Sequence, residues 1–189
     1  MRVCLIRHGL TAPGEQGRYQ GALDAPLSDK GRAALRPAGF SPPRVYVSPA
    51  RRAVETAAIF FPAARQIPVS DLREMNFGAF EGHGWWELED DEAYRAWVAG
   101  GCIGRCPGGE DRAAFSARVC TAFLKIAERE RDSAELVIVA HGGTQMALLG
   151  RFGEDEKKYY EWQRPCGCGW LLDWEKGRLR VRGEVEFLR

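Results

Sequence analysis

Uninterrupted apolar runs alternate along this chain with longer segments that have the spacing of helices. The runs at 3–7 and 136–140 lack the polar alternation of strands that face solvent on one side, and a third strand is expected at 44–48. Such runs are typical of strands in a parallel sheet that helices cover on both faces. We therefore predict an α/β fold, a three-layer sandwich with a mostly parallel central sheet and helices on both faces.

Several segments between these strands carry the signals of helix starts. Ser28 followed by Asp29 is typical of a helix start. Ser48 is a preferred N-cap residue, and Pro49 suits the first turn of the helix that follows. We expect helices near 28–38, from 49 to about 60, near 85–99, near 110–131 and near 143–151.

The rest of the chain is expected to form short strands and loops. Residues 67–69 form a short strand in this interpretation, and residues 71–84 form an irregular loop. Near the end, two runs at 170–174 and 179–187 flank a turn at 175–177, which is the pattern of a hairpin. Such a hairpin would add an antiparallel edge to the sheet.

Composition limits the kind of protein this is. A chain of 189 residues is long enough for one well-packed domain, so residues 1–189 are expected to form a single domain. Lys and Arg number 27 against 26 Asp and Glu, which argues against a nucleic-acid coat or a membrane-surface protein. No apolar stretch approaches the roughly 18 residues that cross a bilayer, and because the chain leads directly into a strand we expect no signal peptide. We expect a soluble, cytoplasmic protein that binds neither nucleic acid nor membranes.

The chain contains six cysteines, and their role must be explained. Because we expect no secretory signal, we expect no disulfide framework. The spacings Cys102-x3-Cys106 and Cys166-Gly-Cys168 differ from the C-x2-C spacing of common zinc sites. We interpret these residues as reduced thiols and expect no bound metal, with a zinc-binding interaction protein as a distant alternative.

Histidines directly follow two of the predicted strands. His8 ends the first run and His141 ends the run at 136–140, and glycine comes after each of them. In parallel sheets the ligand crevice lies at the carboxyl ends of the strands, and glycine lets the backbone approach a ligand closely. Two of the chain's three histidines are therefore predicted to lie at one site.

Arginines accompany these histidines. Arg7 leaves the first strand beside His8, and Arg52 lies one turn into the helix expected after the second strand. Guanidinium groups bind phosphate oxygens bidentately and stay charged at any working pH. The helix expected to begin at Gly142 adds free backbone N–H groups and the positive end of a helix dipole. These groups, together with His141, indicate a pocket for a phosphoryl group.

The same residues suggest a reaction. His8 is the candidate nucleophile, because histidine can carry a phosphoryl group covalently, while Arg7, Arg52 and His141 neutralise its oxygens. An alkoxide leaves poorly without a proton, and Glu74 is the candidate donor because its apolar neighbours would raise its pKa. The chain has no Gly-x4-Gly-Lys loop of a nucleotide–metal site, and we expect no cofactor.

Five ordered segments between residue 3 and about residue 147 resemble the histidine phosphatase superfamily, which has the phosphoglycerate-mutase-like fold. The segments are Leu5–Thr11, Tyr19–Gly31, Ser48–Ala57, Leu72–Gly82 and Ala140–Gly143. The resemblance implies that His8 is the phosphorylated nucleophile and that Glu74 is the proton donor and later the base. It implies a phosphate pocket of Arg7, Arg52 and His141, and it adds Thr11, Arg18 and Gln20 as candidate contacts to substrate or phosphate.

Within the superfamily, two segments are most similar to the α-ribazole phosphatases, which remove phosphate from α-ribazole 5′-phosphate late in cobalamin assembly. They are the acid loop at 72–82 and the helix entry at 107–110, with Phe115, Arg118 and Val119 after it. The segment between Glu74 and His141 is shorter than in the cofactor-dependent phosphoglycerate mutases, which favours a phosphatase.

The sequence thus predicts a metal-independent phosphomonoesterase that acts through a phosphohistidine on a small-molecule phosphate ester, with α-ribazole 5′-phosphate as first candidate. The alternatives are a broad-specificity small-molecule phosphatase, a phosphoglycerate mutase and a non-catalytic phospho-ligand-binding module. Leu10 departs from the family's Glu or Gln, and residues 150–168 match no motif. His83 is expected at the surface or the substrate rim. The aromatic residues expected in the core are Trp85, Trp86, Trp97 and Phe115.

Overall fold

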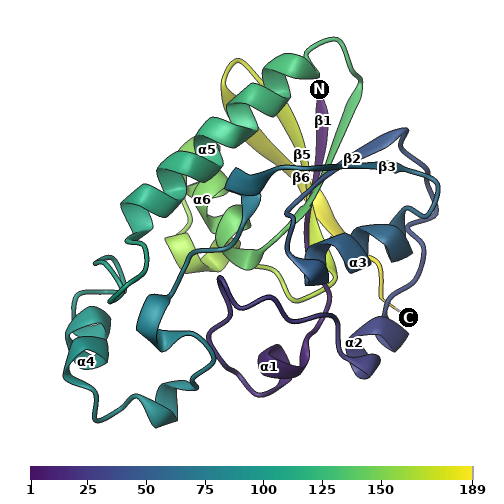
Figure 1. The fold of residues 1–189 in the computed structure, drawn as a ribbon. Helices are drawn as coiled ribbons and strands as arrows, with labels where there is room; N and C mark the ends of the chain where they lie inside the picture. The colour runs from purple at the N-terminus through teal and green to yellow at the C-terminus, as the bar shows by residue number, and fades with distance from the viewer. Residues whose placement is uncertain (189) are drawn as a thin grey trace.

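Six strands run through the middle of the molecule, and the computed structural model describes residues 1–188. The strands are β1 (Arg2–Arg7), β2 (Arg44–Val47), β3 (Arg65–Pro68), β4 (Glu135–Ala140), β5 (Cys168–Glu175) and β6 (Arg178–Glu186). They form one sheet in the order β3-β2-β4-β1-β5-β6 (Figure 1). The first four are parallel to one another, and β5 is antiparallel to both β1 and β6. The predicted parallel sheet with an antiparallel hairpin at its edge is confirmed.

Helices cover both faces of this sheet. The α-helices are α1 (Ala12–Glu15), α2 (Asp29–Ala34), α3 (Arg51–Phe60), α4 (Glu92–Ala99), α5 (Arg112–Arg129) and α6 (Gly142–Phe152). Because successive strand side chains point to opposite faces, Val3 and Leu5 join a buried cluster with α5 and α6, whereas Ile6 joins one with α3. The predicted three-layer α/β architecture is confirmed. No helix within residues 1–188 is long and apolar enough to span a membrane.

The predicted helix at 28–38 is shorter in the structure. Ser28 caps α2 as expected, with its Oγ accepting a hydrogen bond from Gly31 N at 2.9 Å. The helix ends at Ala34, and Leu35 is already extended (ψ 151°). Pro37 disfavours helical geometry at the residue before it and removes a backbone donor, so the helix could not have continued through this segment.

The predicted helix at 85–99 is divided in two. Trp85–Glu87 form a short 3₁₀ turn, η3, and α4 starts only at Glu92. Asp91 caps α4, because its carboxylate accepts a hydrogen bond from Tyr94 N at 2.8 Å. An aspartate used in this way holds its own backbone outside the helix, which explains the break.

Two further segments differ from the prediction. Helix α3 begins at Arg51 with Ala50 at the N-cap position, so Ser48 is not the cap residue. The loop at 71–84 is irregular as predicted, but it contains the 3₁₀ turn η2 (Gly78–Phe80), and another 3₁₀ turn, η1 (Ser70–Leu72), enters it. Helix α1 was not predicted; Thr11 caps it by accepting a hydrogen bond from Gly14 N at 3.1 Å.

The sheet brings three strand ends to one edge. Residue His8 donates its backbone N–H to Ala140 O at 2.9 Å, and Ser48 donates its backbone N–H to Val139 O at 3.0 Å. The ends of β1, β2 and β4 are therefore level with one another, and His141 follows at once. Figure 1 shows α1 and α4 beyond this edge of the sheet, which is the side where the functional residues emerge.

Candidate active site

His8 is held with one ring nitrogen free. Its Nδ1 lies 2.7 Å from Gly9 O, and since a carbonyl oxygen only accepts, Nδ1 carries the proton and donates. The lone pair is therefore on Nε2. The side chain is 7% exposed, and burial together with the nearby Arg52 and Arg7 guanidinium groups holds its pKa well below the ordinary value. A neutral histidine with a free Nε2 is in the form that attacks phosphorus.

His141 packs against His8 edge to face, with ring centroids 5.1 Å apart. Its Nε2 lies 2.7 Å from Ser48 Oγ, and its Nδ1 has no hydrogen-bond partner among the described residues. Burial, Arg52 and His8 hold the pKa of His141 well below its ordinary value, so the ring is neutral. Among the described residues, Nδ1 is thus a buried polar atom without a partner beside the His8 ring.

The guanidinium groups of Arg7 and Arg52 lie near both histidines and contribute to their lowered pKa values. Arg7 donates through Nη1 to Arg164 O at 2.9 Å. Arg52 is fully buried and donates to Leu23 O at 2.8 Å and to Gly21 O at 3.0 Å. In both arginines Nε is buried and has no partner in the part of the chain that the structure describes. A buried cation whose hydrogen-bond partners are backbone carbonyls is stabilised by an anion, so these donors suit phosphoryl oxygens.

Glu74 lies in the loop between η1 and η2, and its carboxyl group reaches the start of α6. Its Oε1 accepts a hydrogen bond from Met75 N at 2.9 Å, and its Oε2 accepts one from Gly143 N at 2.9 Å. Burial raises the pKa of Glu74, although the two N–H groups and the charges of Arg52 and Arg7 act in the opposite direction. A carboxyl with a raised pKa keeps its proton at higher pH and can give it to a leaving group.

A cavity of about 480 Å³ lies next to this group of residues. Arg7, His8 and Glu74 line it, whereas Arg52 and His141 are fully buried and do not. Six aromatic residues also line it: Tyr19, Phe77, Trp97, Phe115, Tyr159 and Tyr160. The cavity therefore offers a cationic region for an anion beside an apolar region for a flat group.

The structure places the other predicted contact residues near the same cavity. Thr11 and Gln20 line it and share a hydrogen bond, from Thr11 Oγ1 to Gln20 Oε1 at 2.7 Å. Arg18 also lines it, but its guanidinium is paired with Glu87 at 2.6 Å. Gly142 is buried behind the wall, where an added Cβ would lie 2.4 Å from the Gln163 side chain.

Comparison with known proteins identifies the family of this chain. The family model of the histidine phosphatase superfamily (branch 1) matches residues 3–184. The chain belongs to the histidine phosphatase superfamily. The predicted class, a phosphoric monoester hydrolase with the phosphoglycerate-mutase-like fold, is confirmed at the level of this family.

Three relatives illustrate the range of this histidine phosphatase family. An adenosylcobalamin/alpha-ribazole phosphatase of Salmonella typhimurium is 34% identical over 80% of this chain and 79% of its own. A metal-independent phosphoserine phosphatase of Arabidopsis thaliana is 30% identical over 96% of this chain and 77% of its own. The crystal structure of the alpha-ribazole phosphatase from Shigella flexneri superposes with a TM-score of 0.81 at 27% identity, covering 96% and 95% of the two chains.

Several cavity residues of this histidine phosphatase were missed in the sequence. Tyr159, Tyr160, Gln163 and Cys166 come from the segment that matched no motif, and only its two adjacent tyrosines gave any signal. Trp97 and Phe115 are in the core as predicted, yet both also line the cavity. The expectation of a core position is wrong for Trp85 and Trp86, which are 59% and 43% exposed.

The remaining expectations concern His83 and the thiols. His83 is half exposed and lies 3.8 Å from Glu87, so it is a surface residue as predicted. All six cysteines are free, and two of them, Cys102 and Cys166, line the cavity. No three His, Cys, Asp or Glu side chains within residues 1–188 are grouped as ligands for a metal ion.

Proposed function

We propose that residues 1–189 form one catalytic domain, a metal-independent phosphomonoesterase that works through a phosphohistidine at His8. The observation that carries the proposal is a set of three buried donors that have no partner among residues 1–188 and lie beside Nε2 of His8. These donors are Arg7 Nε, Arg52 Nε and His141 Nδ1. A phosphoryl group accepts from all three, and its charge is neutralised by two guanidinium groups.

In the first step of this mechanism, His8 Nε2 attacks phosphorus and the ester P–O bond breaks. Arg7, Arg52 and His141 hold the three equatorial oxygens while charge develops on them. Glu74 gives its proton to the departing oxygen, so that an alcohol leaves instead of an alkoxide. The phosphoryl group is then bonded to His8 nitrogen.

In the second step a water molecule takes the place that the alcohol left. Glu74, now a carboxylate, removes a proton from the water as its oxygen attacks phosphorus. The P–N bond breaks, inorganic phosphate leaves and His8 returns to its neutral form. One carboxyl group thus acts as acid and then as base, which its raised pKa supports.

For the substrate, we propose α-ribazole 5′-phosphate, an alkyl phosphate whose sugar carries a flat benzimidazole. Two observations support this substrate. The cavity next to the phosphate donors is lined by aromatic side chains, and base–aromatic stacking contributes about 1–3 kcal/mol per base. Relatives named as alpha-ribazole phosphatases are also similar to this chain over most of its length.

A second candidate is a phosphate ester with a carboxylate in its leaving group, such as phosphoserine. Arg112 favours it, because this residue lines the cavity and has no carboxylate partner among residues 1–188. Its guanidinium lies 4.7 Å from the centroid of the Tyr159 ring. An arginine without a carboxylate partner suits a second anionic group of the substrate.

The test is phosphate release in EDTA from α-ribazole 5′-phosphate, phosphoserine, sugar phosphates, phosphoglycerates and nucleotides. His8→Ala is the control, together with labelling of the protein by a ³²P substrate quenched at alkaline pH, where phosphohistidine survives. We expect labelling and turnover in the wild type and neither in His8→Ala. Labelling that persists in His8→Ala would overturn the proposed nucleophile.

The substrate panel separates the alternatives. A preference for α-ribazole 5′-phosphate supports the cobalamin assignment, and a preference for phosphoserine that Arg112→Gln removes supports the second candidate. Similar turnover of many esters indicates a broad-specificity phosphatase. Interconversion of phosphoglycerates without phosphate release indicates a mutase, and binding without turnover indicates a non-catalytic module.

We also propose a cytoplasmic location. Six free cysteines, four of them buried, fit a compartment that keeps thiols reduced. Fractionation of the source cells with an antibody against the protein tests this, and recovery outside the cytoplasmic fraction would contradict it.

A further inference from the structure

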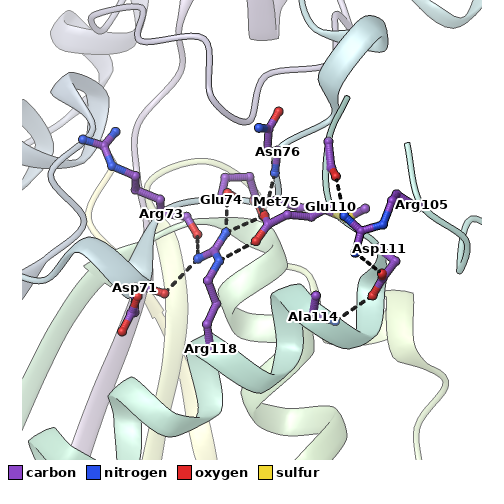
Figure 2. Close-up of polar contacts among 11 residues, drawn as sticks. Asp71, Arg73, Glu74, Met75, Asn76, Arg105, Glu110, Asp111, Ala114 and Arg118 are labelled. Carbon is purple, nitrogen blue, oxygen red and sulfur yellow. Dashed lines mark hydrogen bonds and ion pairs between the residues drawn. The ribbon is translucent and has the colours of Figure 1, made fainter. Parts of the chain in front are cut away.

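Arg118, on α5, makes every hydrogen bond that its guanidinium can donate. Its Nη1 donates to Asp71 O at 2.9 Å and to Arg73 O at 2.8 Å, and its Nη2 donates to Glu74 O at 2.9 Å. The other two N–H groups go to Glu110, from Nε at 2.7 Å and from Nη2 at 2.7 Å. Figure 2 shows this guanidinium between the loop that carries Glu74 and the start of α5.

Glu110 binds the backbone of the same loop at Asn76. Its Oε2 accepts a hydrogen bond from Asn76 N at 2.9 Å, and its backbone N donates to Asn76 O at 2.8 Å. The ion pair with Arg118 is partly buried, with 23% and 24% of the two side chains exposed. Arg118 and Glu110 together therefore hold backbone atoms of residues 71, 73, 74 and 76.

The loop needs such support because it has little of its own. Between η1 and η2, residues 73–77 belong to no helix or strand that would fix their backbone. Within the described part of the chain, the Glu74 side chain accepts hydrogen bonds only from Met75 N and Gly143 N. A catalytic group is effective only when its neighbours hold it within a fraction of an ångström of the productive position.

We propose that Arg118 and Glu110 are positioning residues for the proton donor Glu74, and that their ion pair keeps its carboxyl at the leaving-group oxygen. Neither residue lines the cavity, so they act through the loop and do not touch the substrate. The inference rests on the proposed role of Glu74. Loss of the pair should impair proton transfer and leave phosphoryl binding by Arg7 and Arg52 intact.

The readout is the dependence of kcat/KM on the leaving group. An alkyl phosphate needs a proton donor, whereas p-nitrophenyl phosphate has a leaving group that needs little help. For Arg118→Gln and Glu110→Gln, we expect kcat/KM to fall about tenfold or more on the alkyl phosphate, since general acid catalysis contributes roughly 10²–10⁴-fold. On p-nitrophenyl phosphate we expect a change within about twofold. Arg118→Lys should not restore the alkyl activity, because an ammonium group cannot reach five acceptors.

The chain offers a matched control in the same helix start. Arg105 pairs with Asp111 at 2.9 Å and donates to Gly109 O at 3.1 Å, and within the described residues it makes no hydrogen bond or ion pair with residues 71–76 (Figure 2). Arg105→Gln therefore removes a more exposed arginine–carboxylate pair, with 65% and 26% of the two side chains exposed. It should leave the ratio of alkyl to aryl activity unchanged. Thermal unfolding and phosphohistidine labelling from p-nitrophenyl phosphate verify that each variant is folded and has an intact pocket.

A double variant separates positioning from general damage. In a Glu74→Gln background, Arg118→Gln should cause no further fall in the alkyl-to-aryl ratio, because the donor that it positions is already absent. Equal losses on the two substrates, or additive losses in the double variant, would overturn the inference. If Glu74→Gln alone leaves the ratio unchanged, the proposed role of Glu74 has failed; if it lowers the ratio and Arg118→Gln does not, only the positioning pair has failed.

Discussion

The Oγ atom of Ser48 lies 2.7 Å from Nε2 of His141, at a point where the ends of β2 and β4 meet. Ser48 Oγ is also the acceptor for Ala50 N at 3.4 Å, which leaves its hydroxyl hydrogen free to donate to the imidazole. A neutral His141 that accepts at Nε2 carries its proton on Nδ1. That nitrogen has no partner within residues 1–188, and in the proposed mechanism it donates to a phosphoryl oxygen.

Ser48→Ala should therefore weaken catalysis without removing any group from the cavity. The variant lets His141 take either tautomer. We expect kcat/KM to fall by about tenfold on alkyl and aryl phosphates alike, because the loss of one hydrogen bond of about 1.4 kcal/mol corresponds to a tenfold change. Steady-state kinetics on both substrates test this. Ser48→Thr, which keeps the hydroxyl, is the control, and an unchanged kcat/KM in Ser48→Ala would contradict the role of this contact.

The pH dependence of activity should have two limbs with separate origins. The nucleophile must be neutral, and burial with two arginines lowers the pKa of His8, so activity persists well below pH 6.5. The donor must be protonated, and burial raises the pKa of Glu74, so kcat/KM on alkyl phosphates falls as the pH rises through that raised value. Glu74→Gln should lose the alkaline limb on alkyl phosphates, and a limb that remains would assign it to another group.

The same histidines make stability depend on pH. Unfolded His141 binds a proton below about pH 6.5, whereas burial lowers the pKa of the folded residue and keeps it neutral. The free energy of unfolding therefore falls as the pH drops below about 6.5, by up to about 1.4 kcal/mol per pH unit for each such histidine. The raised pKa of Glu74 acts with the opposite sign, so the comparison must be with a variant.

Urea unfolding of wild type and His141→Gln between pH 4.5 and 7.5, in buffer without phosphate, isolates this contribution. We expect the slope of unfolding free energy against pH to be smaller in the variant by up to about 1.4 kcal/mol per unit. Identical slopes would mean that folded His141 takes up a proton over this range.

Most of the sheet could be predicted, because a strand buried on both faces leaves an uninterrupted apolar run that is visible locally. Strands β1 and β4 are such runs. The helix predicted at 85–99 was wrong in its first part, because Trp85 and Trp86 are apolar without being buried and Asp91 caps a helix that starts only at Glu92. Trp85 is 59% exposed, whereas Trp97 in α4 is 8% exposed, and composition does not distinguish the two.

Some features of the site could also be predicted from the sequence, and others could not. The positions of His8 and His141 could be predicted, since each directly follows a recognisable strand. The contact of Ser48 with His141 joins residues 93 apart in the chain, and that of Arg118 with Glu74 joins residues 44 apart. Neither contact leaves a periodic pattern in the sequence, because it depends on where the loops meet once the sheet has formed.

Glu81 holds a second loop of the site, and its loss should affect phosphate binding. Its carboxylate accepts hydrogen bonds from the backbone of Gly21, Ala22 and Leu23. The carbonyls of that loop, Gly21 O and Leu23 O, accept from Arg52. In Glu81→Gln the amide NH₂ faces backbone N–H groups, which costs about 2 kcal/mol of stability.

Arg52 contributes to the binding of both kinds of ester, and Glu81 holds the loop that orients Arg52. In Glu81→Gln, kcat/KM should therefore fall by a similar factor on alkyl and aryl phosphates. A loss of 1.4 kcal/mol of binding free energy corresponds to about tenfold. Inhibition by inorganic phosphate should weaken in parallel. Glu89→Gln, on the exposed segment before α4, is the control. A loss confined to alkyl phosphates would place Glu81 with the proton donor instead.

Gly143 is the point at which one methyl group should disable the donor. A Cβ at this position would lie 2.0 Å from Glu74 Oε1 and 2.9 Å from Phe115 Cζ, so the carboxyl must move away. Gly143→Ala should reproduce Glu74→Gln, with a loss of roughly 10²-fold in kcat/KM on alkyl phosphates and little loss on p-nitrophenyl phosphate. Gly183→Ala, where a Cβ meets nothing within 4 Å, is the matched control. If Gly143→Ala keeps full alkyl activity, the carboxyl of Glu74 does not need its place beside α6, and the proton comes from another group.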